Sequence, residues 1–261
     1  MFKECDVTDL KDKKPFLKIN KLDSDQSGEK EYKLNSLGFR GEEFNKKTKF
    51  KLFIAGCSNT FGTGLNWEET WGYQFKKIFC KKYNYNLNKV NLMNFGIIGQ
   101  SNDFIVRNVL TQMSYVKPDL LIIFFTYTNR TEYLIEDQIE RIGPWDLESK
   151  IQHAIDYYVY YTHEIGFANL MRNILLAQNY CKLNKIKYIF NLINYEDLYN
   201  GVFSYNSACL SLVQLVDKKY ICDFTLEKLD LAADGAHYGY KSHKLFAEKL
   251  FKFYEERRYK K

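Results

Sequence analysis

Short runs of apolar residues alternate with longer stretches in which apolar positions recur at helical spacing. The short runs predict buried strands at residues 50–55, 90–95, 120–125 and 188–193, with a fifth, shorter strand at 220–224. The longer stretches predict helices at residues 67–83 and 102–115, at 149–183 with a break near Gly166, within 195–218, and over 245–254. This alternation predicts an α/β fold with a parallel sheet and helices on both faces. Residues 131–150 show no such period and are expected to form an irregular excursion over the top of the sheet.

Length and composition fit this picture without dividing the chain. At 261 residues, with 46% hydrophobic and 27% charged residues, the chain suits a single large domain with a sizeable core. The first residues are polar and lack periodicity. We therefore expect an N-terminal arm over residues 1–34 and one domain over residues 35–261.

Charge and cysteine content argue against several classes of partner. The net charge of +6 is modest and the lysines are scattered, which does not fit a nucleic-acid-binding surface. The six cysteines are widely spaced and form no C-x-x-C pair, so neither a zinc site nor a disulfide framework is indicated. No segment resembles a signal peptide, and the longest apolar run is too short to span a membrane. These features predict a soluble cytoplasmic protein, and they leave open its oligomeric state, its release by cell lysis and its assembly into a virus particle.

A serine stands at the turn between the first predicted strand and the first predicted helix. Gly56 ends the strand, and Ser58 follows two residues later. Such a turn lifts a serine hydroxyl out of the sheet edge, and the start of the next helix offers free backbone N–H groups to an anion. The turn therefore suits a serine nucleophile. The alternative is a plain strand-to-helix turn with Ser58 or Asn59 as the helix cap.

One of the four histidines has the neighbour that a catalytic base requires. His237 follows the last predicted strand in a glycine-flanked loop, three residues after Asp234. This spacing lets the carboxylate reach the imidazole and fix its tautomer, as a base for serine requires. The alternative is an aspartate helix cap with a histidine nearby. The other histidines, His153, His163 and His243, are expected to be solvated or structural.

Three strand ends supply donors for a developing oxyanion. Ser58, Gly99 and Asn129 each come just after the carboxyl end of a predicted strand, and these ends meet at one edge of a parallel sheet. The backbone N–H groups of Ser58 and Gly99 and the side-chain amide of Asn129 would stabilise the negative charge. Alternatively, Gly99 meets a need for positive φ and Asn129 caps a turn.

These residues fall in four blocks whose order resembles the SGNH hydrolases, also called the GDSL esterase/lipase family. The blocks are Gly56-Cys57-Ser58-Asn59, Asn94-Phe95-Gly96-Ile97-Ile98-Gly99-Gln100-Ser101, Thr126-Tyr127-Thr128-Asn129-Arg130 and Asp234-Gly235-Ala236-His237. Residues 35–41, whose spacing alone favours a surface turn, also resemble a segment that precedes the first block in many members. The resemblance implies a flavodoxin-like three-layer α/β/α sandwich with a five-stranded parallel sheet, and an enzyme without metal or organic cofactor. It also implies roles for the site residues: Ser58 is the nucleophile, His237 its base, Asp234 the residue that orients His237, and Ser58, Gly99 and Asn129 the oxyanion hole.

The sequence departs from the family pattern in two of the blocks. Cys57 stands where an aspartate usually precedes the nucleophile. Thr126 replaces a glycine and Arg130 replaces an aspartate. We predict that Asn59 and Arg130 bind substrate, with Arg130 contacting an anionic or sugar-hydroxyl part of it. The alternative for Arg130 is an ion pair with Glu132 or another nearby carboxylate.

Together these features predict a serine ester hydrolase that cleaves a small acyl ester through an acyl-enzyme. The expected partner is a small-molecule or carbohydrate ester, such as an acetyl group on a sugar. A lysophospholipase, thioesterase or acyltransferase would use the same residues. The alternative from another class is a non-catalytic carbohydrate-binding or structural module on the same fold. Nucleotide binding is disfavoured because the first loop lacks a glycine-rich run for phosphate.

Overall fold

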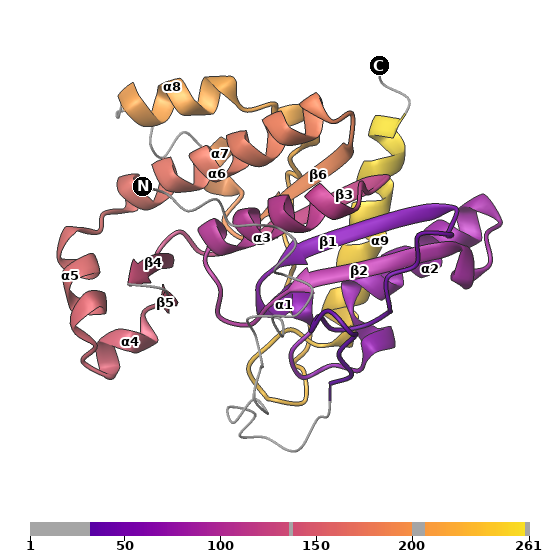
Figure 1. Ribbon diagram of the computed structural model, residues 1–261, viewed down its shortest axis with the longest axis horizontal. Helices are drawn as coiled ribbons and strands as arrows, with labels where there is room; N and C mark the ends of the chain where they lie inside the picture. The colour runs from indigo at the N-terminus through magenta and orange to yellow at the C-terminus, as the bar shows by residue number, and fades with distance from the viewer. Residues whose placement is uncertain (1–31, 136–137, 200–206, 259–261) are drawn as a thin grey trace.

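The computed structural model describes residues 32–135, 138–199 and 207–258, and its centre is a parallel β-sheet (Figure 1). The sheet has four strands in the order β2, β1, β3, β6. Their bounds are Phe50–Gly56 for β1, Val90–Gly96 for β2, Leu120–Phe125 for β3 and Lys187–Leu192 for β6. All neighbouring pairs run parallel, so the segments that follow the strands start from the same edge of the sheet.

Helices cover both faces of this sheet (Figure 1). They are α2 (Trp71–Tyr83), α3 (Asn102–Tyr115), α6 (His163–Leu183) and α9 (Tyr240–Arg258). Alternate strand residues enter two separate cores: Phe53 and Ala55 pack with α3 and α6, whereas Leu52 and Ile54 pack with α2 and α9. The predicted α/β fold, with a parallel sheet between two helical layers, is confirmed.

The predicted fifth strand is reduced to a single bridge. Ile221 forms an isolated parallel bridge with Phe190 of β6, in the place where the next strand would lie. Before this bridge the chain turns in a 3-10 helix, η4 (Lys218–Tyr220). After it, the carbonyl of Phe224 accepts a hydrogen bond from the Asn191 side chain at 2.6 Å instead of from a strand backbone. The bridge is not extended into a ladder in either direction, so the sheet in the described residues has four strands rather than five.

Residues 131–150, predicted to be irregular, contain regular structure. β4 (Thr131–Ile135) and β5 (Gln138–Ile142) pair as an antiparallel hairpin, and α4 (Trp145–Glu148) follows them. Together with α5 (Gln152–Tyr160) they form a lobe on the side toward which the sheet strands point, at the left of Figure 1. We call residues 131–162 the insertion.

The predicted helix over residues 149–183 divides at Thr162 rather than near Gly166. The Thr162 hydroxyl caps α6 by accepting a hydrogen bond from the Ile165 N–H at 3.3 Å. Gly166 lies inside α6, where an added Cβ would come within 2.6 Å of the Tyr161 hydroxyl. The glycine therefore makes room for Tyr161, which connects α5 to α6, and it does not break the helix.

The remaining elements are short. They are α1 (Ser58–Phe61), η2 (Trp67–Glu69), η3 (Leu87–Lys89), α7 (Glu196–Tyr199) and α8 (Ser207–Leu215). The helix predicted over residues 67–83 thus begins as a 3-10 turn, and α2 starts only after its cap, Thr70. The predicted arm, residues 1–34, lies almost wholly outside the described residues. Within the described ranges, every helix is too short or too polar to cross a lipid bilayer.

His243 is buried in α9 and ties that helix to α2. Its Nδ1 atom accepts a hydrogen bond from the Trp71 N–H at 3.0 Å, and the residue is 1% exposed. Burial lowers the pKa of His243 from 6.5 to about 3. The ring is therefore a neutral hydrogen-bond acceptor in the folded protein.

We expect His243 to make the fold acid-sensitive. Between pH 6.5 and about pH 3 the unfolded chain holds a proton on this residue that the folded chain does not, so stability falls as the pH falls through this window. The loss of unfolding free energy can reach about 1.4 kcal/mol per pH unit. Urea unfolding at several pH values checks this, with His243→Asn as the control, because an asparagine oxygen can accept from the Trp71 N–H without titrating. Equal acid sensitivity of the two proteins would contradict the prediction.

Candidate active site

Ser58 begins α1 at the carboxyl end of β1. The turn is tight, because a Cβ on Gly56 would lie 2.2 Å from the Thr60 hydroxyl and 2.8 Å from the Phe124 carbonyl oxygen. Glycine at this position lets the chain turn sharply and leaves Ser58 half-buried at the strand end. The backbone N–H groups of Ser58 and Asn59 open the helix and have no intrahelical acceptor. They can therefore donate to a bound group.

Arg40 holds the end of this helix from a segment that precedes the sheet. Its guanidinium donates to the carbonyl oxygens of Phe61 at 2.9 Å, Gly62 at 2.5 Å and Leu65 at 2.6 Å. Burial lowers the pKa of Arg40 to about 10. The chain does turn at residues 36–38, where Ser36 and Leu37 are exposed, but Phe39 and Arg40 are both buried, so residues 35–41 are more than a surface turn. This segment is also a support for the Ser58 turn.

Replacing Arg40 with methionine is expected to cost about 3 kcal/mol of unfolding free energy, because three buried carbonyl groups lose their charged donor. Arg40→Lys keeps the charge without the planar fork and should recover only part of this loss. Arg107→Gln, which breaks an exposed pair with Glu132, is the control and should cost less than about 1 kcal/mol. Urea unfolding measures all three. Similar losses for Arg40→Met and Arg107→Gln would show that Arg40 is no support.

Asp234 contacts His237 within one loop. The Oδ2 atom of Asp234 lies 2.5 Å from Nδ1 of His237. The Oδ1 atom accepts the N–H groups of Ala236 and His237, both at 3.0 Å, so Asp234 caps the turn and contacts the imidazole at the same time. Burial alone would raise the pKa of Asp234, but these N–H donors and the imidazole outweigh it, so the pKa lies below its usual value. An ionised Asp234 favours the His237 tautomer with its proton on Nδ1, which leaves Nε2 as an acceptor.

A backbone contact joins this loop to the turn that follows Ser58. The Ala233 N–H donates to the Gly64 carbonyl at 3.1 Å. Gly64 has a φ of 76°, and a Cβ there would lie 2.7 Å from the Ala232 side chain and 3.1 Å from Cγ of Asp234. The Gly64 N–H donates to the Tyr32 hydroxyl at 2.8 Å. The close approach at Gly64 brings the Asp234–His237 loop to the same edge of the sheet as Ser58.

Gly99 lies in the loop after β2 with a φ of 73°. The backbone therefore has the positive φ that the sequence offered as one reason for a glycine at this position. A Cβ at this position would lie 2.5 Å from Nη1 of Arg141, which donates to the neighbouring Ile98 carbonyl at 2.9 Å. The loop after β2 is therefore covered on one side by a guanidinium from the insertion.

Asn129 lies in the turn after β3. Its backbone carbonyl accepts a hydrogen bond from the Tyr158 hydroxyl at 2.6 Å. Its side-chain Oδ1 atom is buried and has no hydrogen-bond partner among the described residues, so the amide does not cap the turn through this oxygen. Tyr158 of the insertion thus binds the backbone of Asn129, whereas the side-chain Oδ1 of Asn129 has no hydrogen bond to any described residue.

The sequence left open that Arg130 pairs with Glu132 instead of binding substrate. The described part of the structure contains no such ion pair. Glu132 instead accepts two hydrogen bonds from Arg107, at 2.9 and 2.8 Å. Arg130 donates from Nη1 to Sγ of Cys57 at 3.0 Å and to the Thr126 hydroxyl at 3.3 Å. Arg130 therefore contacts Cys57 and Thr126, the two other positions at which the sequence departs from the SGNH pattern, and Cys57 directly precedes Ser58.

Four of the nine buried polar atoms without partners in the described residues belong to the Ser58 turn or to residues 129 and 130. Among the described residues, Oδ1 of Asn59 and Oγ1 of Thr60 follow Ser58 in the chain, Nε of Arg130 belongs to a side chain that contacts Cys57, and Oδ1 of Asn129 belongs to the residue before Arg130. Buried polar groups are normally hydrogen-bonded, and exceptions mark sites where a ligand or water completes the network. The orphaned atoms therefore support a binding site at this edge.

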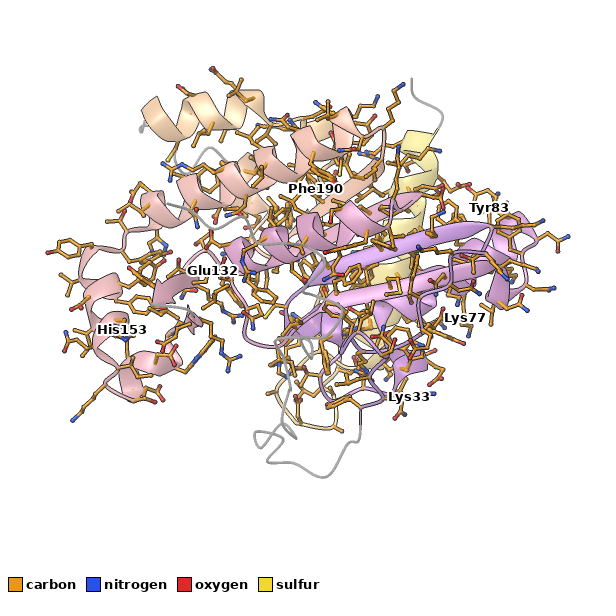
Figure 2. The ribbon with its side chains drawn as sticks, in the orientation of Figure 1. Lys33, Lys77, Tyr83, Glu132, His153 and Phe190 are labelled. Carbon is orange, nitrogen blue, oxygen red and sulfur yellow. The ribbon has the colours of Figure 1, made fainter. Side chains whose placement is uncertain are left out.

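Other candidate groups lie elsewhere. In Figure 2, His153 is on the outer helix of the insertion, where it lies 3.7 Å from Glu140. His163 is the first residue of α6, and His243 is the buried acceptor described above. Within the described ranges, no three His, Cys, Asp or Glu side chains lie where they could share a metal ion.

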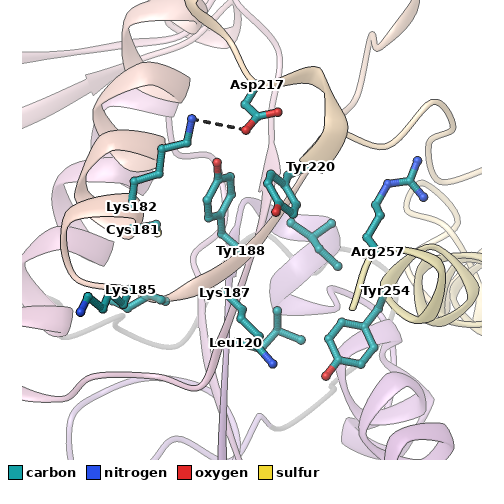
Figure 3. Close-up of a pocket in the computed structure, with 12 residues that line it drawn as sticks. Leu120, Cys181, Lys182, Lys185, Lys187, Tyr188, Asp217, Tyr220, Tyr254 and Arg257 are labelled. Atoms are coloured by element: carbon teal, nitrogen blue, oxygen red, sulfur yellow. Dashed lines mark ion pairs between the residues drawn. The ribbon is translucent and has the colours of Figure 1, made fainter. Parts of the chain in front are cut away.

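A cavity of about 410 Å³ opens at the amino ends of β3 and β6, at the opposite edge from Ser58 (Figure 3). It is lined by Tyr188 and Tyr220, and an ion pair of 3.3 Å between Lys182 and Asp217 lies beside it. This cavity is separate from the residues that the sequence singled out.

The sequence did not single out Arg141 and Trp145, which complete the surroundings of the site. The ring of Trp145 lies under both Arg130 and Arg141, with distances of 5.0 and 5.9 Å from each guanidinium carbon to the ring centre. The one available signal was Trp145 itself, a large aromatic residue after Gly143-Pro144 in a stretch without period.

Solved structures similar to this chain are SGNH or GDSL esterases and lipolytic proteins. The structure of TesA is 15% identical and aligns over 79% of this chain and 98% of that chain, with a TM-score of 0.46. A lipolytic protein of the G-D-S-L family from Desulfitobacterium hafniense DCB-2 is 16% identical over 78% and 99%, with a TM-score of 0.44. The esterase EstA from Pseudoalteromonas sp. is 12% identical and aligns over 79% of this chain and 97% of its own, with a TM-score of 0.47. No family model and no curated protein sequence matches the chain, so its chemistry is inferred from its own residues.

Proposed function

We propose that this protein is a serine ester hydrolase of the SGNH type. The observation that carries the proposal is the contact between Asp234 and His237, in a loop fastened to the turn that follows Ser58. An ionised carboxylate on Nδ1 of an imidazole, at the strand edge where a serine opens a helix, is the arrangement that activates a serine hydroxyl.

In the proposed reaction, Ser58 attacks the ester carbonyl and Nε2 of His237 takes the hydroxyl proton. The N–H groups of Ser58 and Gly99 and the side-chain amide of Asn129 stabilise the tetrahedral oxyanion. His237 then gives the proton to the leaving alcohol, and an acyl-enzyme remains. Water, deprotonated by His237, attacks this acyl-enzyme and releases the acid. Asp234 stays ionised throughout and stabilises the imidazolium.

The substrate class that we propose is a small acyl ester, with an acetyl group on a carbohydrate as the first candidate. Asn59 and Arg130 are the proposed substrate-binding residues, because each has a polar atom without a partner beside Ser58. A lysophospholipase or an acyltransferase would use the same acyl-enzyme and differ in the acyl chain or in the acceptor.

Covalent labelling with a fluorophosphonate tests the nucleophile before the natural substrate is known. We expect the label on the peptide that contains Ser58, and no label on Ser58→Ala or on the unfolded protein. Hydrolysis of p-nitrophenyl acetate, butyrate and octanoate then ranks acyl length, with acetate expected to be the best substrate. A folded protein that takes no label and cleaves none of these esters would favour the non-catalytic carbohydrate-binding or structural module.

A further inference from the structure

Two arginines share one aromatic ring at the edge of the candidate site. Arg130 follows Asn129 in the turn after β3, and Arg141 comes from β5 of the insertion. Their guanidinium carbons lie 5.0 and 5.9 Å from the ring centre of Trp145. We call Arg130 and Arg141 the arginine pair. Stacking on an indole holds the planar guanidinium groups in place and leaves their edges available for hydrogen bonds.

The arginine pair contacts two of the three turns that carry the proposed oxyanion donors, and Arg130 follows Asn129 in the third. Arg130 donates to Sγ of Cys57, the residue before Ser58, at 3.0 Å. Arg141 donates to the carbonyl of Ile98, the residue before Gly99, at 2.9 Å. The pair therefore lies beside the place where the ester would be cleaved.

Several carboxylates in the described part of the insertion have other polar partners. Glu132 binds Arg107 through two hydrogen bonds, and Glu140 lies 3.7 Å from His153. Asp146 accepts the Gly143 N–H at 2.8 Å. Among the residues that the structure describes, neither member of the arginine pair has an ion pair.

The arginine pair also keeps hydrogen-bonding capacity. The Nε atom of Arg130 is buried without a partner, and the contacts of its Nη1 are a sulfur and a hydroxyl. Two like charges beside one ring repel each other, and an anion between or beside them would relieve that repulsion and accept the unused N–H groups.

We propose that the arginine pair binds a negatively charged group, a carboxylate or a phosphate, that the ester substrate carries close to the scissile bond. This inference rests on the proposed function and narrows its substrate class from small acyl esters in general to those that carry a negatively charged group. Trp145 supplies the stacking surface that orients the two guanidinium groups.

Three aryl acetates with the same acyl group provide the kinetic test. They are 4-acetoxybenzoate with a carboxylate, 4-acetoxyphenyl phosphate with a phosphate, and neutral methyl 4-acetoxybenzoate. Each kcat/KM is divided by the rate of hydroxide hydrolysis of the same ester, which removes differences in leaving-group reactivity. We expect the better anionic ester to exceed the neutral one by about tenfold or more, and the two anions to tell a carboxylate site from a phosphate site. Equal normalised values for all three esters would overturn the inference.

Variants then test whether the arginine pair causes the preference for anionic over neutral esters. Arg130→Gln and Arg141→Gln should each lower the ratio of anionic to neutral ester by about tenfold. Cys57→Asp keeps both arginines but places a carboxylate against Arg130, and it should lower the same ratio. Arg172→Gln, which removes an exposed arginine of α6 away from the arginine pair, should leave the ratio within about twofold of wild type. A ratio of anionic to neutral ester that stays at the wild-type value in both Arg130→Gln and Arg141→Gln would contradict the proposal.

A binding measurement separates this inference from the proposed function. Calorimetric titration of Ser58→Ala with inorganic phosphate and with benzoate needs no catalysis. If no ester is cleaved and no fluorophosphonate binds, but phosphate or benzoate binds Ser58→Ala and not the Ser58→Ala, Arg141→Gln double variant, the proposed function fails and the anion site stands. If esters are cleaved without anion preference and neither anion binds, the inference fails and the proposed function stands.

Discussion

Ser58→Ala is expected to lower kcat for ester hydrolysis by about a thousandfold or more, because the acyl-enzyme can no longer form. The fold should tolerate the change. The backbone carbonyl of Ser58, which accepts the N–H groups of Gly62 at 2.8 Å and Thr63 at 3.1 Å, remains in alanine. KM and the midpoint of thermal unfolding should therefore stay close to the wild-type values.

Steady-state kinetics on p-nitrophenyl acetate and a thermal unfolding curve measure this result. Ser114→Ala, in the exposed last turn of α3, is a matched control in which the serine hydroxyl serves only the Thr111 carbonyl. Wild-type kcat in Ser58→Ala would remove Ser58 as the nucleophile. A large fall in Ser114→Ala would mean that the assay reports folding instead of chemistry.

Asp234→Asn is expected to lower kcat by a similar factor, about a thousandfold or more, while the loop keeps its shape. Asparagine can still accept the N–H groups of Ala236 and His237 through one oxygen. Its amide nitrogen then faces Nδ1 of His237 as a donor, so the imidazole is driven to the opposite tautomer and Nε2 loses its acceptor lone pair.

Asp234→Asn should also change how the free energy of unfolding depends on pH, and the direction of this change can be predicted. Because the folded state lowers the pKa of Asp234, the wild-type carboxylate stabilises the fold above the ordinary aspartate pKa of about 3.9 and loses this contribution as the pH falls through the folded value. The stability advantage of wild type over Asp234→Asn should therefore shrink below about pH 4. Kinetics at neutral pH and urea unfolding at acid pH test the two parts. An unchanged kcat would show that Asp234 only caps its turn.

The sequence predicted well those elements whose own residues determine which secondary structure forms. The run at residues 120–125 is apolar on both faces because β3 is buried between two helical layers. The helix over residues 102–115 has an apolar stripe and begins after Ser101, whose hydroxyl caps it by accepting from the Phe104 N–H at 3.2 Å. In both cases local propensity and tertiary packing favour the same structure.

The hairpin of the insertion and the missing fifth strand depend on partners that no local pattern encodes. β4 and β5 pair only with each other, so polar and apolar residues mix and no clear alternation predicts a strand. At residues 220–224 a short apolar run favoured a strand, but the segment forms only one bridge, and the Phe224 carbonyl binds the Asn191 side chain. Pairing partners, more than propensity, decided both segments.

The candidate site shows the same division. The contact between Asp234 and His237 joins residues three apart, and spacing predicted it. The contacts of Arg40 with the Leu65 carbonyl and of Arg141 with the Ile98 carbonyl join residues 25 and 43 positions apart. Only the fold brings such residues together, so spacing alone gave the wrong environment for Arg40 and no role for Arg141.

The insertion is one continuous stretch that supplies Arg141 and Trp145, whereas Ser58, Gly99 and the Asp234–His237 loop belong to the loops of the sheet itself. In the proposed function, the groups that cleave the bond and one part of the anion site, Arg141 with Trp145, are thus encoded in separate stretches of the gene, and Arg130 directly precedes the insertion. Exchanging the insertion as a cassette would then change which esters are accepted while the proposed nucleophile, base and oxyanion donors stay the same. Such a cassette has to keep a donor in place of the Tyr158 hydroxyl, which holds the Asn129 carbonyl at 2.6 Å.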